Sequence, residues 1–144
     1  PYKGADGGVR PNYMAVLKGT DSTRTMWIMA HIDIVPEGDL KLWNTDPFTA
    51  VIKNGNIYGR GTEDNHQAIV SGIFVAKAFK EESITPPINI GLLLVSDEEN
   101  GSDNGVKYMI QHNKNLIGKN DLIIVPDAGD PKGETIEVAE KSTL

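Results

Sequence analysis

Histidine and carboxylate side chains recur in this sequence where apolar segments give way to loops. These side chains are found in His31-Ile32-Asp33, Asp64, Asp97-Glu98-Glu99 and Asp127. Imidazole nitrogens and carboxylate oxygens bind zinc, manganese or cobalt, and a carboxylate can bridge two such ions about 3.5–4 Å apart. The chain has no cysteine, so a metal must be held by histidine, aspartate or glutamate. The repeated pattern predicts a metal site.

Two adjacent glutamates, Glu98 and Glu99, follow the most apolar run of the chain, residues 88–95. Such a run is typical of a buried parallel strand, and open α/β sheets keep their ligand sites at the carboxyl ends of such strands. One glutamate could therefore bind a metal while its neighbour handles the proton of a water molecule. The alternative is a solvated acidic turn.

His31 and Asp33 stand at the end of an early apolar strand. The period of two residues places them on one side of that strand. The imidazole could bind a metal through one nitrogen while a neighbouring carboxylate holds the other ring N–H. The alternative is a buried histidine that is hydrogen-bonded to an acid for structural reasons alone.

Asp64 lies in a tight loop, residues 59–67, directly before an amphipathic helix. Its charge is favourable near a helix N-terminus, so a helix cap is the alternative to a metal ligand. The loop lacks the Lys-Ser/Thr of a P-loop and the glycine spacing of a dinucleotide site, which disfavours phosphate binding. We expect His66 to lie on the surface or behind the ligands, and His112 to be an exposed helix residue.

Apolar spacing also predicts the elements that position these residues. Two strands, residues 13–18 and 25–32, are expected to form a hairpin, and the Asn-Gly turn at 54–55 predicts a second one. The remaining expected elements are a helix from about 68 to 82, a strand at 88–95, a helix at 104–113, a short buried strand at 122–125 and a strand beginning at 136. The spacing of about thirty residues is typical of βαβ units and predicts an α/β fold.

Composition narrows the class of protein. The chain has 144 residues, 39% of them hydrophobic, and a formal net charge of −6. The absence of a Lys/Arg cluster argues against a nucleic-acid surface, and the apolar runs are too short to span a bilayer. No secretory signal is visible, and the lack of cysteine fits a cytoplasmic protein.

The order of the motifs resembles metallopeptidase family M20, the dinuclear zinc family of aminoacylase, carboxypeptidase G, acetylornithine deacetylase, succinyl-diaminopimelate desuccinylase and related dipeptidases. The resemblance covers most of residues 11–140. Its motifs are His31-x-Asp33 with Val35-Pro36, Trp43 with Pro47-Phe48, Gly59-Arg60-Gly61-x-x-Asp64-Asn65, Asp97-Glu98-Glu99 and Pro126-Asp127.

The resemblance implies a three-layer α/β catalytic domain with a mostly parallel sheet, and a role for each motif residue. It implies two divalent metal ions, zinc in the first place, with cobalt or manganese as alternatives. It also implies a cis peptide bond between Asp64 and Asn65. In this interpretation the metal ligands are His31, Asp64 as the bridge, Glu99 and Asp127, and the catalytic residues are Glu98 as general base and Asp33, which orients His31.

Two departures from the family pattern stand out. The segment Asn65-His66-Gln67 replaces the commoner Asp-Lys-Gly. The family's final metal-binding histidine, which follows an inserted lid or dimerisation domain, has no counterpart within the 144 residues. We therefore expect residues 1–144 to form the N-terminal portion of such a catalytic domain, without the lid or dimerisation domain and the C-terminal catalytic half. This portion is expected to bind metal weakly on the Glu99 side and to be inactive alone.

The expected reaction is hydrolysis of an amide or peptide bond in a small substrate, such as an N-acyl amino acid, succinyl-diaminopimelate or a dipeptide. The longer protein could form a homodimer. Two alternatives stay open: a metal-binding or regulatory module without catalysis, and an α/β domain whose acids are only caps and turns.

Overall fold

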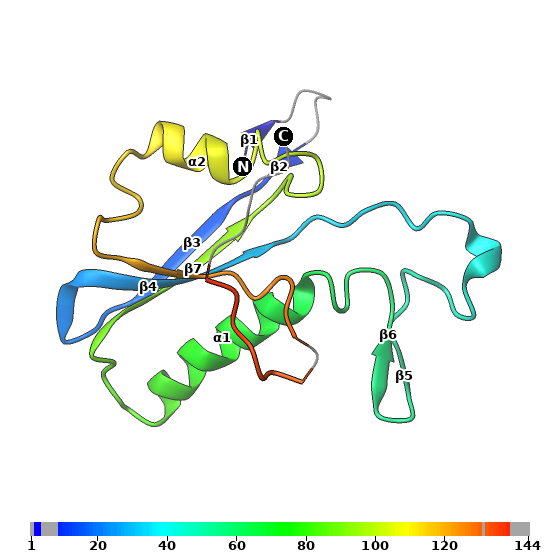
Figure 1. Cartoon of the computed structure of the whole chain (residues 1–144), viewed down its shortest axis with the longest axis horizontal. Coiled ribbons are helices and arrows are strands. Elements are labelled where there is room, and N and C mark those ends of the chain that lie inside the picture. The colour runs from blue at the N-terminus through cyan, green and yellow to red at the C-terminus, as the bar shows by residue number, and fades with distance from the viewer. Residues whose placement is uncertain (1, 4–8, 131, 139–144) are drawn as a thin grey trace.

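A computed structural model describes residues 2–3, 9–130 and 132–138 of the chain (Figure 1). Neither of the two helices in this part of the chain is long and apolar enough to cross a membrane. The elements are β1 (Tyr2–Lys3), β2 (Val9–Arg10), β3 (Tyr13–Leu17), β4 (Asp21–His31), the 3-10 helix η1 (Leu40–Leu42), β5 (Val51–Lys53), β6 (Asn56–Tyr58), α1 (His66–Glu81), β7 (Ile88–Val95), α2 (Val106–His112) and β8 (Leu122–Ile124).

The central sheet has four strands in the order β3-β7-β4-β8. β4 runs parallel to both β7 and β8, and β3 runs antiparallel to β7. The predicted mostly parallel sheet is confirmed, but the predicted hairpin of β3 with β4 is wrong. The amides of Thr20 and Asp21 donate to the carbonyls of Pro86 and Pro87 at 2.9 Å. After β3 the chain crosses the start of β7, so β3 and β4 pair with opposite sides of β7 and not with each other.

Helices cover the two faces of this sheet (Figure 1). On one face Trp27, Leu93 and Val95 form a buried cluster, and Val106 and Met109 of α2 pack against it. A Cβ at Gly91 would lie 2.3 Å from the Trp27 ring, so the glycine makes room for the indole.

The other face of the sheet meets α1 at Gly72. A Cβ added there would lie 3.0 Å from Leu92 and 3.2 Å from Ile28, so the helix backbone approaches the sheet closely. Together with the packing of α2, this contact confirms the three-layer arrangement predicted from the family resemblance.

The edge strand β8 differs from its prediction. Leu122, Ile123 and Ile124 are exposed at 44–48%, because β8 pairs only with β4 in the described part of the chain. The buried strand expected at 122–125 is therefore an exposed edge strand. The strand expected from residue 136 is also absent: residues 136–138 have no regular structure, and Ala139 lies outside the described residues.

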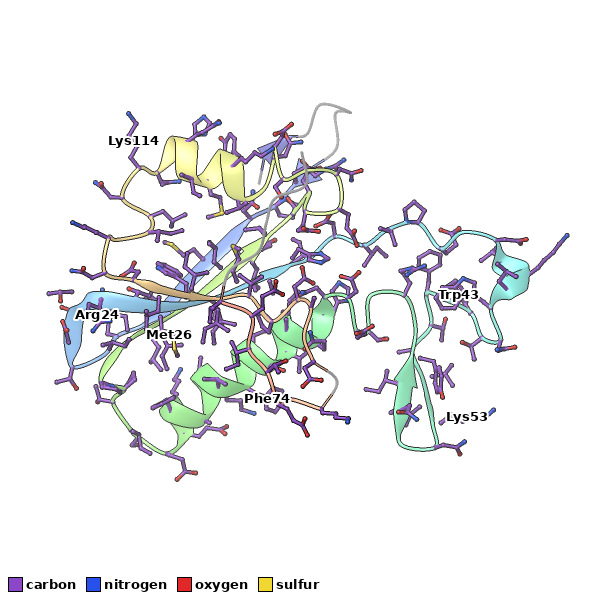
Figure 2. The ribbon with its side chains drawn as sticks, viewed as in Figure 1. Arg24, Met26, Trp43, Lys53, Phe74 and Lys114 are labelled. Carbon is purple, nitrogen blue, oxygen red and sulfur yellow. The ribbon has the colours of Figure 1, made fainter. Side chains whose placement is uncertain are left out.

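An arm formed by residues 32–60 extends away from the layers and carries the hairpin of β5 with β6 (Figure 1). This hairpin confirms the Asn-Gly turn prediction, with Asn54 and Gly55 both at positive φ. Trp43 lies within the arm and Lys53 on the hairpin (Figure 2). The arm leads from the end of β4 to the loop before α1 and thus links two of the predicted ligands.

Candidate metal centre

His31 is the last residue of β4 and is only 2% exposed. It pairs in parallel register with Val95, the last residue of β7, so both strands end at the same edge of the sheet. Its Nδ1 lies 2.9 Å from the backbone carbonyl of Asp33 and 3.7 Å from the Asp33 carboxylate. A carbonyl oxygen only accepts, so Nδ1 carries the hydrogen. The orienting contact predicted for Asp33 is thus made by its backbone.

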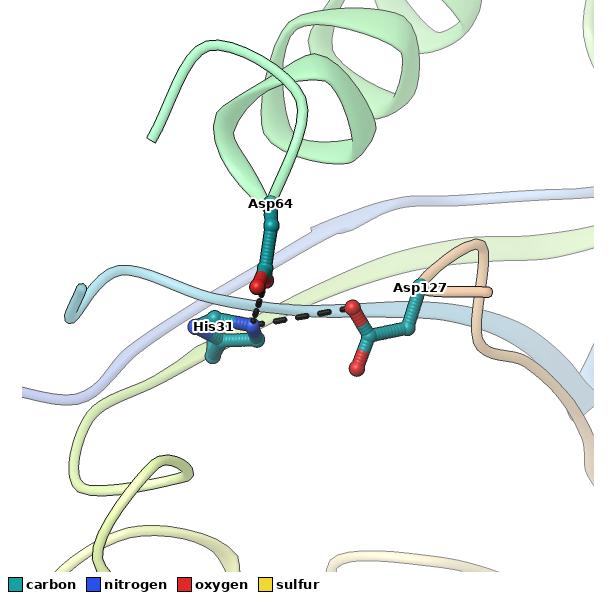
Figure 3. A group of neighbouring side chains, drawn as sticks. All are labelled: His31, Asp64 and Asp127. Atoms are coloured by element: carbon teal, nitrogen blue, oxygen red, sulfur yellow. Dashed lines mark hydrogen bonds and ion pairs between the residues drawn. The ribbon is translucent and has the colours of Figure 1, made fainter. Parts of the chain in front are cut away.

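The other ring nitrogen, Nε2, faces carboxylates from two distant parts of the chain (Figure 3). It lies 2.9 Å from Asp64 Oδ1 and 3.6 Å from Asp127 Oδ1. In the neutral ring Nε2 presents a lone pair, which repels carboxylate oxygens unless a cation lies between them. A proton or a metal ion can serve as that cation.

The pKa of His31 reflects this surplus of negative charge. Burial alone would lower the pKa of the imidazole, but the hydrogen bond to Asp33 and the charges of Asp127, Asp33 and Glu98 outweigh it and raise the pKa above its usual value. The protein therefore favours a cation at Nε2 even though the ring is buried.

Asp64 approaches His31 from the loop that precedes α1. The peptide bond between Asp64 and Asn65 is cis, as the family resemblance predicted. Asn65 takes the N-cap position but makes no side-chain cap bond, and the Asp64 side chain is about half exposed, at 55%. The Asp64 carboxylate turns toward His31, so the simple helix-cap alternative does not describe it.

Asp127 follows β8 and approaches the same nitrogen of His31 from a different direction than Asp64 (Figure 3). Its Oδ1 accepts a hydrogen bond from Asn65 Nδ2. The sequence did not predict this contact of the Asn65 side chain. No local pattern could have found it, because the two residues are 62 positions apart.

The glutamate pair is held by the carboxylate of Asp33. Asp33 Oδ1 accepts the amide of Glu98 and Oδ2 accepts the amide of Glu99, each at 3.2 Å. Glu98 Oε2 lies 4.0 Å from His31 Nε2. The Asp33 side chain thus fixes the turn that presents both glutamates, a role that the sequence did not predict.

Glu98 is half-exposed at the edge of the site. Burial raises the pKa of the Glu98 carboxyl, and the negative charges of Asp127, Glu99 and Asp33 raise it further. The charge of His31 lowers this pKa, but the net result is a pKa above the usual value. A carboxylate with a raised pKa is better suited to accept a proton near neutral pH.

Glu99 is placed differently from the other predicted ligands. Among the described residues, the side chains that meet as a potential metal-binding group are those of His31, Asp64 and Asp127, and Glu99 is not one of them. Its Oε1 is nevertheless buried without any hydrogen-bond partner in the described part of the chain. A buried carboxylate oxygen in that state is costly unless a water molecule, another donor or a cation meets it.

The turn also depends on Asp97, a buried residue with a left-handed backbone (φ 66). Its Oδ2 accepts the backbone amide and the side-chain amide of Asn104, both at 2.9 Å. Asn12 Oδ1 in turn accepts the amide of Ser96 at 3.0 Å. The sequence did not predict these contacts, and Asn12 and Ser96 are 84 positions apart.

The two other histidines lie apart from the cluster. His66 is half-buried at the start of α1, with Nε2 3.4 Å from the carbonyl of Ile32. His112 is exposed on α2, where its Nδ1 lies 2.9 Å from the carbonyl of Tyr108. Both placements agree with the sequence predictions.

The donor set fits a divalent cation. It offers one imidazole nitrogen and two carboxylate oxygens within 4.8 Å of one another, and the chain has no cysteine to add a thiolate. Nitrogen and oxygen donors of this kind suit zinc, manganese or cobalt. A positive charge would stabilise both the lone pair of Nε2 and the unpartnered oxygen of Glu99.

Comparison with known proteins assigns the family. The profile of peptidase family M20/M25/M40 matches residues 27–141. The chain belongs to this family. A metallohydrolase of Methanococcus maripaludis, itself uncharacterized, is 50% identical over 142 residues, which cover 97% of this chain and 34% of the relative. A succinyl-diaminopimelate desuccinylase of Acidovorax ebreus is 32% identical over 125 residues, 85% of this chain and 32% of the relative. This M20 chain thus spans about a third of the length of these relatives.

Solved structures of the family share the fold. The M20 family metallo-carboxypeptidase Sso-CP2 of Sulfolobus solfataricus has a TM-score of 0.72 and 33% identity, covering 85% of this chain and 28% of that one. Human carnosine dipeptidase 1 has a TM-score of 0.71 and 27% identity, covering 82% of this chain and 25% of that one. The M20 chain therefore has the α/β architecture of these two proteins.

Proposed function

We propose that this M20 chain supplies the metal centre of an enzyme that hydrolyses an amide or peptide bond in a small substrate. One observation carries the proposal: the lone pair of His31 Nε2 faces Asp64 at 2.9 Å and Asp127 at 3.6 Å. A structural histidine would face donors or a single acid. Here two acids converge on one buried nitrogen, and a metal ion bound between them would satisfy all three groups.

The proposed ligands are His31, Asp64, Asp127 and Glu99. Asp64, the most exposed of these carboxylates, is the candidate bridge, and Glu99 is the candidate ligand for a second ion. Divalent ions bound by such ligands polarise a carbonyl group and lower the pKa of water. Zinc fits the nitrogen and oxygen donors best, with cobalt or manganese as alternatives.

Glu98 is the proposed general base. It takes a proton from the attacking water and returns that proton to the leaving amine. Its position 4.0 Å from His31 Nε2 places the carboxylate beside the proposed ligands without making it one of them. Asp33 supports this role because its carboxylate holds the Glu98 amide.

A depression of about 680 Å³ opens beside Asp64. Its lining includes the aromatic residues Trp43 and Tyr58 and the cationic residues Lys53 and Arg60. A small polar substrate such as an N-acyl amino acid or a dipeptide fits a space of this size and character. The names of the relatives support the same class, since they include a desuccinylase, a metallo-carboxypeptidase and a dipeptidase.

The whole protein's organisation belongs to the same proposal. Because relatives are about three times as long as this chain, we propose that residues 1–144 form the N-terminal portion of the catalytic domain. A histidine beyond residue 144 would complete the Glu99 side, and a lid or dimerisation domain would close the site. Residues 1–144 alone are then expected to be inactive. The cytoplasmic location of the protein stays a prediction.

The test compares Glu98→Gln with the unaltered enzyme in the full-length protein. Glutamine keeps the size of the side chain but cannot take a proton, so kcat is expected to fall by about 10²–10⁴. Zinc content should stay the same, because Glu98 is not a proposed ligand. The substrates are N-acyl amino acids, succinyl-diaminopimelate and dipeptides.

Glu82→Gln is the matched control, because Glu82 is exposed at the far end of α1. It should leave both kcat and zinc content unchanged. Full activity of Glu98→Gln would remove Glu98 as the base. Absence of bound metal in the unaltered protein would refute the metal centre and leave a domain whose acids serve the fold alone.

A further inference from the structure

The segment that carries Asp127 has little support from the sheet. β8 pairs with β4 for only three residues, ending where Ile124 pairs with Ile28. The same offset of 96 residues would place residue 127 beside His31 (124 − 28 = 96 and 127 − 31 = 96). The ladder does not extend that far, and Pro126 has no amide hydrogen to continue it. Asp127 therefore reaches His31 from a segment without regular structure.

Two side-chain amides from the N-terminal end of α1 hold this segment instead. Asn65 Nδ2 donates to the Asp127 carboxylate, and Gln67 Nε2 donates to the carbonyl of Pro126 at 2.8 Å. The Asn65 side chain is fully buried, and that of Gln67 is half-buried. These bonds join residues about 60 positions apart and attach the end of β8 to the helix.

The helix that makes these bonds is itself fixed against the sheet. α1 packs closely on Ile28 and Leu92 through Gly72, and the loop before it carries Asp64. The position of Asp127 relative to Asp64 is thus set by one rigid body, the first turn of α1 with its preceding loop. A carboxylate held only by a loose loop would sample many positions and lose affinity for a shared cation.

We infer that Gln67 is a positioning residue for the metal centre, and that with Asn65 it clamps the Pro126–Asp127 segment to α1 so that Asp127 stays within reach of His31 Nε2. The inference rests on the proposed function, because it concerns the same ligands. The hydrogen bond of the Gln67 side chain goes to the carbonyl of Pro126, the residue before Asp127, and not to the Asp127 carboxylate itself.

Gln67 allows a clean test because it can be changed without altering any proposed ligand. Gln67→Met keeps the length of the side chain and removes the donor. Gln67→Glu keeps the shape and places a carboxylate against the Pro126 carbonyl. Loss of one partly buried hydrogen bond predicts a roughly fivefold weaker binding of Co²⁺ for Gln67→Met, and a larger loss for Gln67→Glu. Gln111→Met, on the exposed face of α2, is the matched control.

Two measurements on the full-length protein separate positioning from a loss of stability. Titration with Co²⁺ followed by visible absorption gives the affinity and, from the shape of the spectrum, the coordination geometry. Backbone ¹⁵N relaxation of the metal-free protein gives the order parameter of the Asp127 amide, expected to fall from about 0.85 toward 0.6 in Gln67→Met. Thermal unfolding should show that the variant is folded at the temperature of both measurements.

The outcomes distinguish the inference from the proposed function. If the unaltered protein takes up no Co²⁺, the proposed function fails, and the inference fails with it. If the unaltered protein binds Co²⁺ and Gln67→Met gives the same affinity, spectrum and order parameter, only the inference is overturned. Weaker binding with an altered spectrum and a mobile Asp127, absent in Gln111→Met, supports the clamp.

Discussion

The contacts of Asp33 allow us to predict the size of the effect of replacing this residue. The sequence suggested that this carboxylate orients His31, but the structure places the backbone carbonyl of Asp33 at 2.9 Å from the ring and the carboxylate at 3.7 Å. The two carboxylate oxygens instead accept the amides of Glu98 and Glu99. Replacement of Asp33 by alanine should therefore act on the glutamate turn.

The size of the effect follows from these two bonds. Each measures 3.2 Å, which is long for a bond to a charged acceptor, and the Asp33 side chain is 21% exposed, so water replaces part of what is lost. We expect Asp33→Ala to lower the free energy of unfolding by about 2 kcal/mol. For a chain of this size that corresponds to a fall in Tm of roughly 4–8 °C.

The effect on catalysis should be larger than the effect on stability. A displacement of the proton acceptor by about 1 Å can lower the rate roughly 100-fold, so kcat of Asp33→Ala should fall by about that factor. The assay measures kcat and KM of the full-length enzyme at a temperature where unfolding curves show the variant to be folded.

Asp21→Ala is the matched control. The Asp21 carboxylate also accepts two hydrogen bonds, from the amide and the hydroxyl of Thr23, but it is exposed at the opposite end of β4. Its removal should leave kcat unchanged. The reasoning about Asp33 is wrong if Asp33→Ala keeps the kcat of the unaltered enzyme, or if the control loses as much activity.

Two further predictions concern the fold. Gly91→Ala should lower the free energy of unfolding by about 1–3 kcal/mol, because its Cβ would lie 2.3 Å from the Trp27 ring; an unchanged urea midpoint would contradict this packing. Asp121→Ala should lower it by about 2 kcal/mol at pH 7, because the carboxylate accepts the amides of Thr25 and Gly118 and the Trp27 indole N–H. Burial alone would raise the pKa of Asp121, but these bonds outweigh it and lower the pKa below the ordinary 3.8. The stabilisation is therefore present above about pH 4 and is lost as the pH falls through the folded-state pKa, so the difference in urea midpoint between the two proteins should narrow below pH 4.

Local patterns were sufficient for most of the elements. The apolar run at 88–95 predicted β7, the three- and four-residue spacing after 67 predicted α1, and the Asn54-Gly55 turn predicted the hairpin of β5 with β6. These elements are encoded by neighbouring residues, so their periodicity is visible in one stretch of sequence. The pairing of β3 with β7 was missed because hydrogen bonds between residues far apart leave no local pattern.

For the candidate site as well, the sequence predicted the residue types, and the structure decided their contacts. The types and order of His31, Asp64, Glu98, Glu99 and Asp127 were readable from the sequence and, through the family resemblance, predicted a metal centre. The sequence could not show which atoms meet. That the Asp33 carbonyl orients His31 and the Asp33 carboxylate holds the glutamates depends on how β4 and β7 end side by side.

The sequence by itself determined the supply of ligands, the alternation of strands and helices, and the absence of thiolate chemistry. The tertiary structure alone decided that Asp64 and Asp127, 63 residues apart, converge on one nitrogen of His31 (127 − 64 = 63). It also decided that Asn65 and Gln67 attach the end of β8 to α1. The physical reason is that local structure depends on neighbouring residues, whereas a binding site depends on the packing that brings distant ones together.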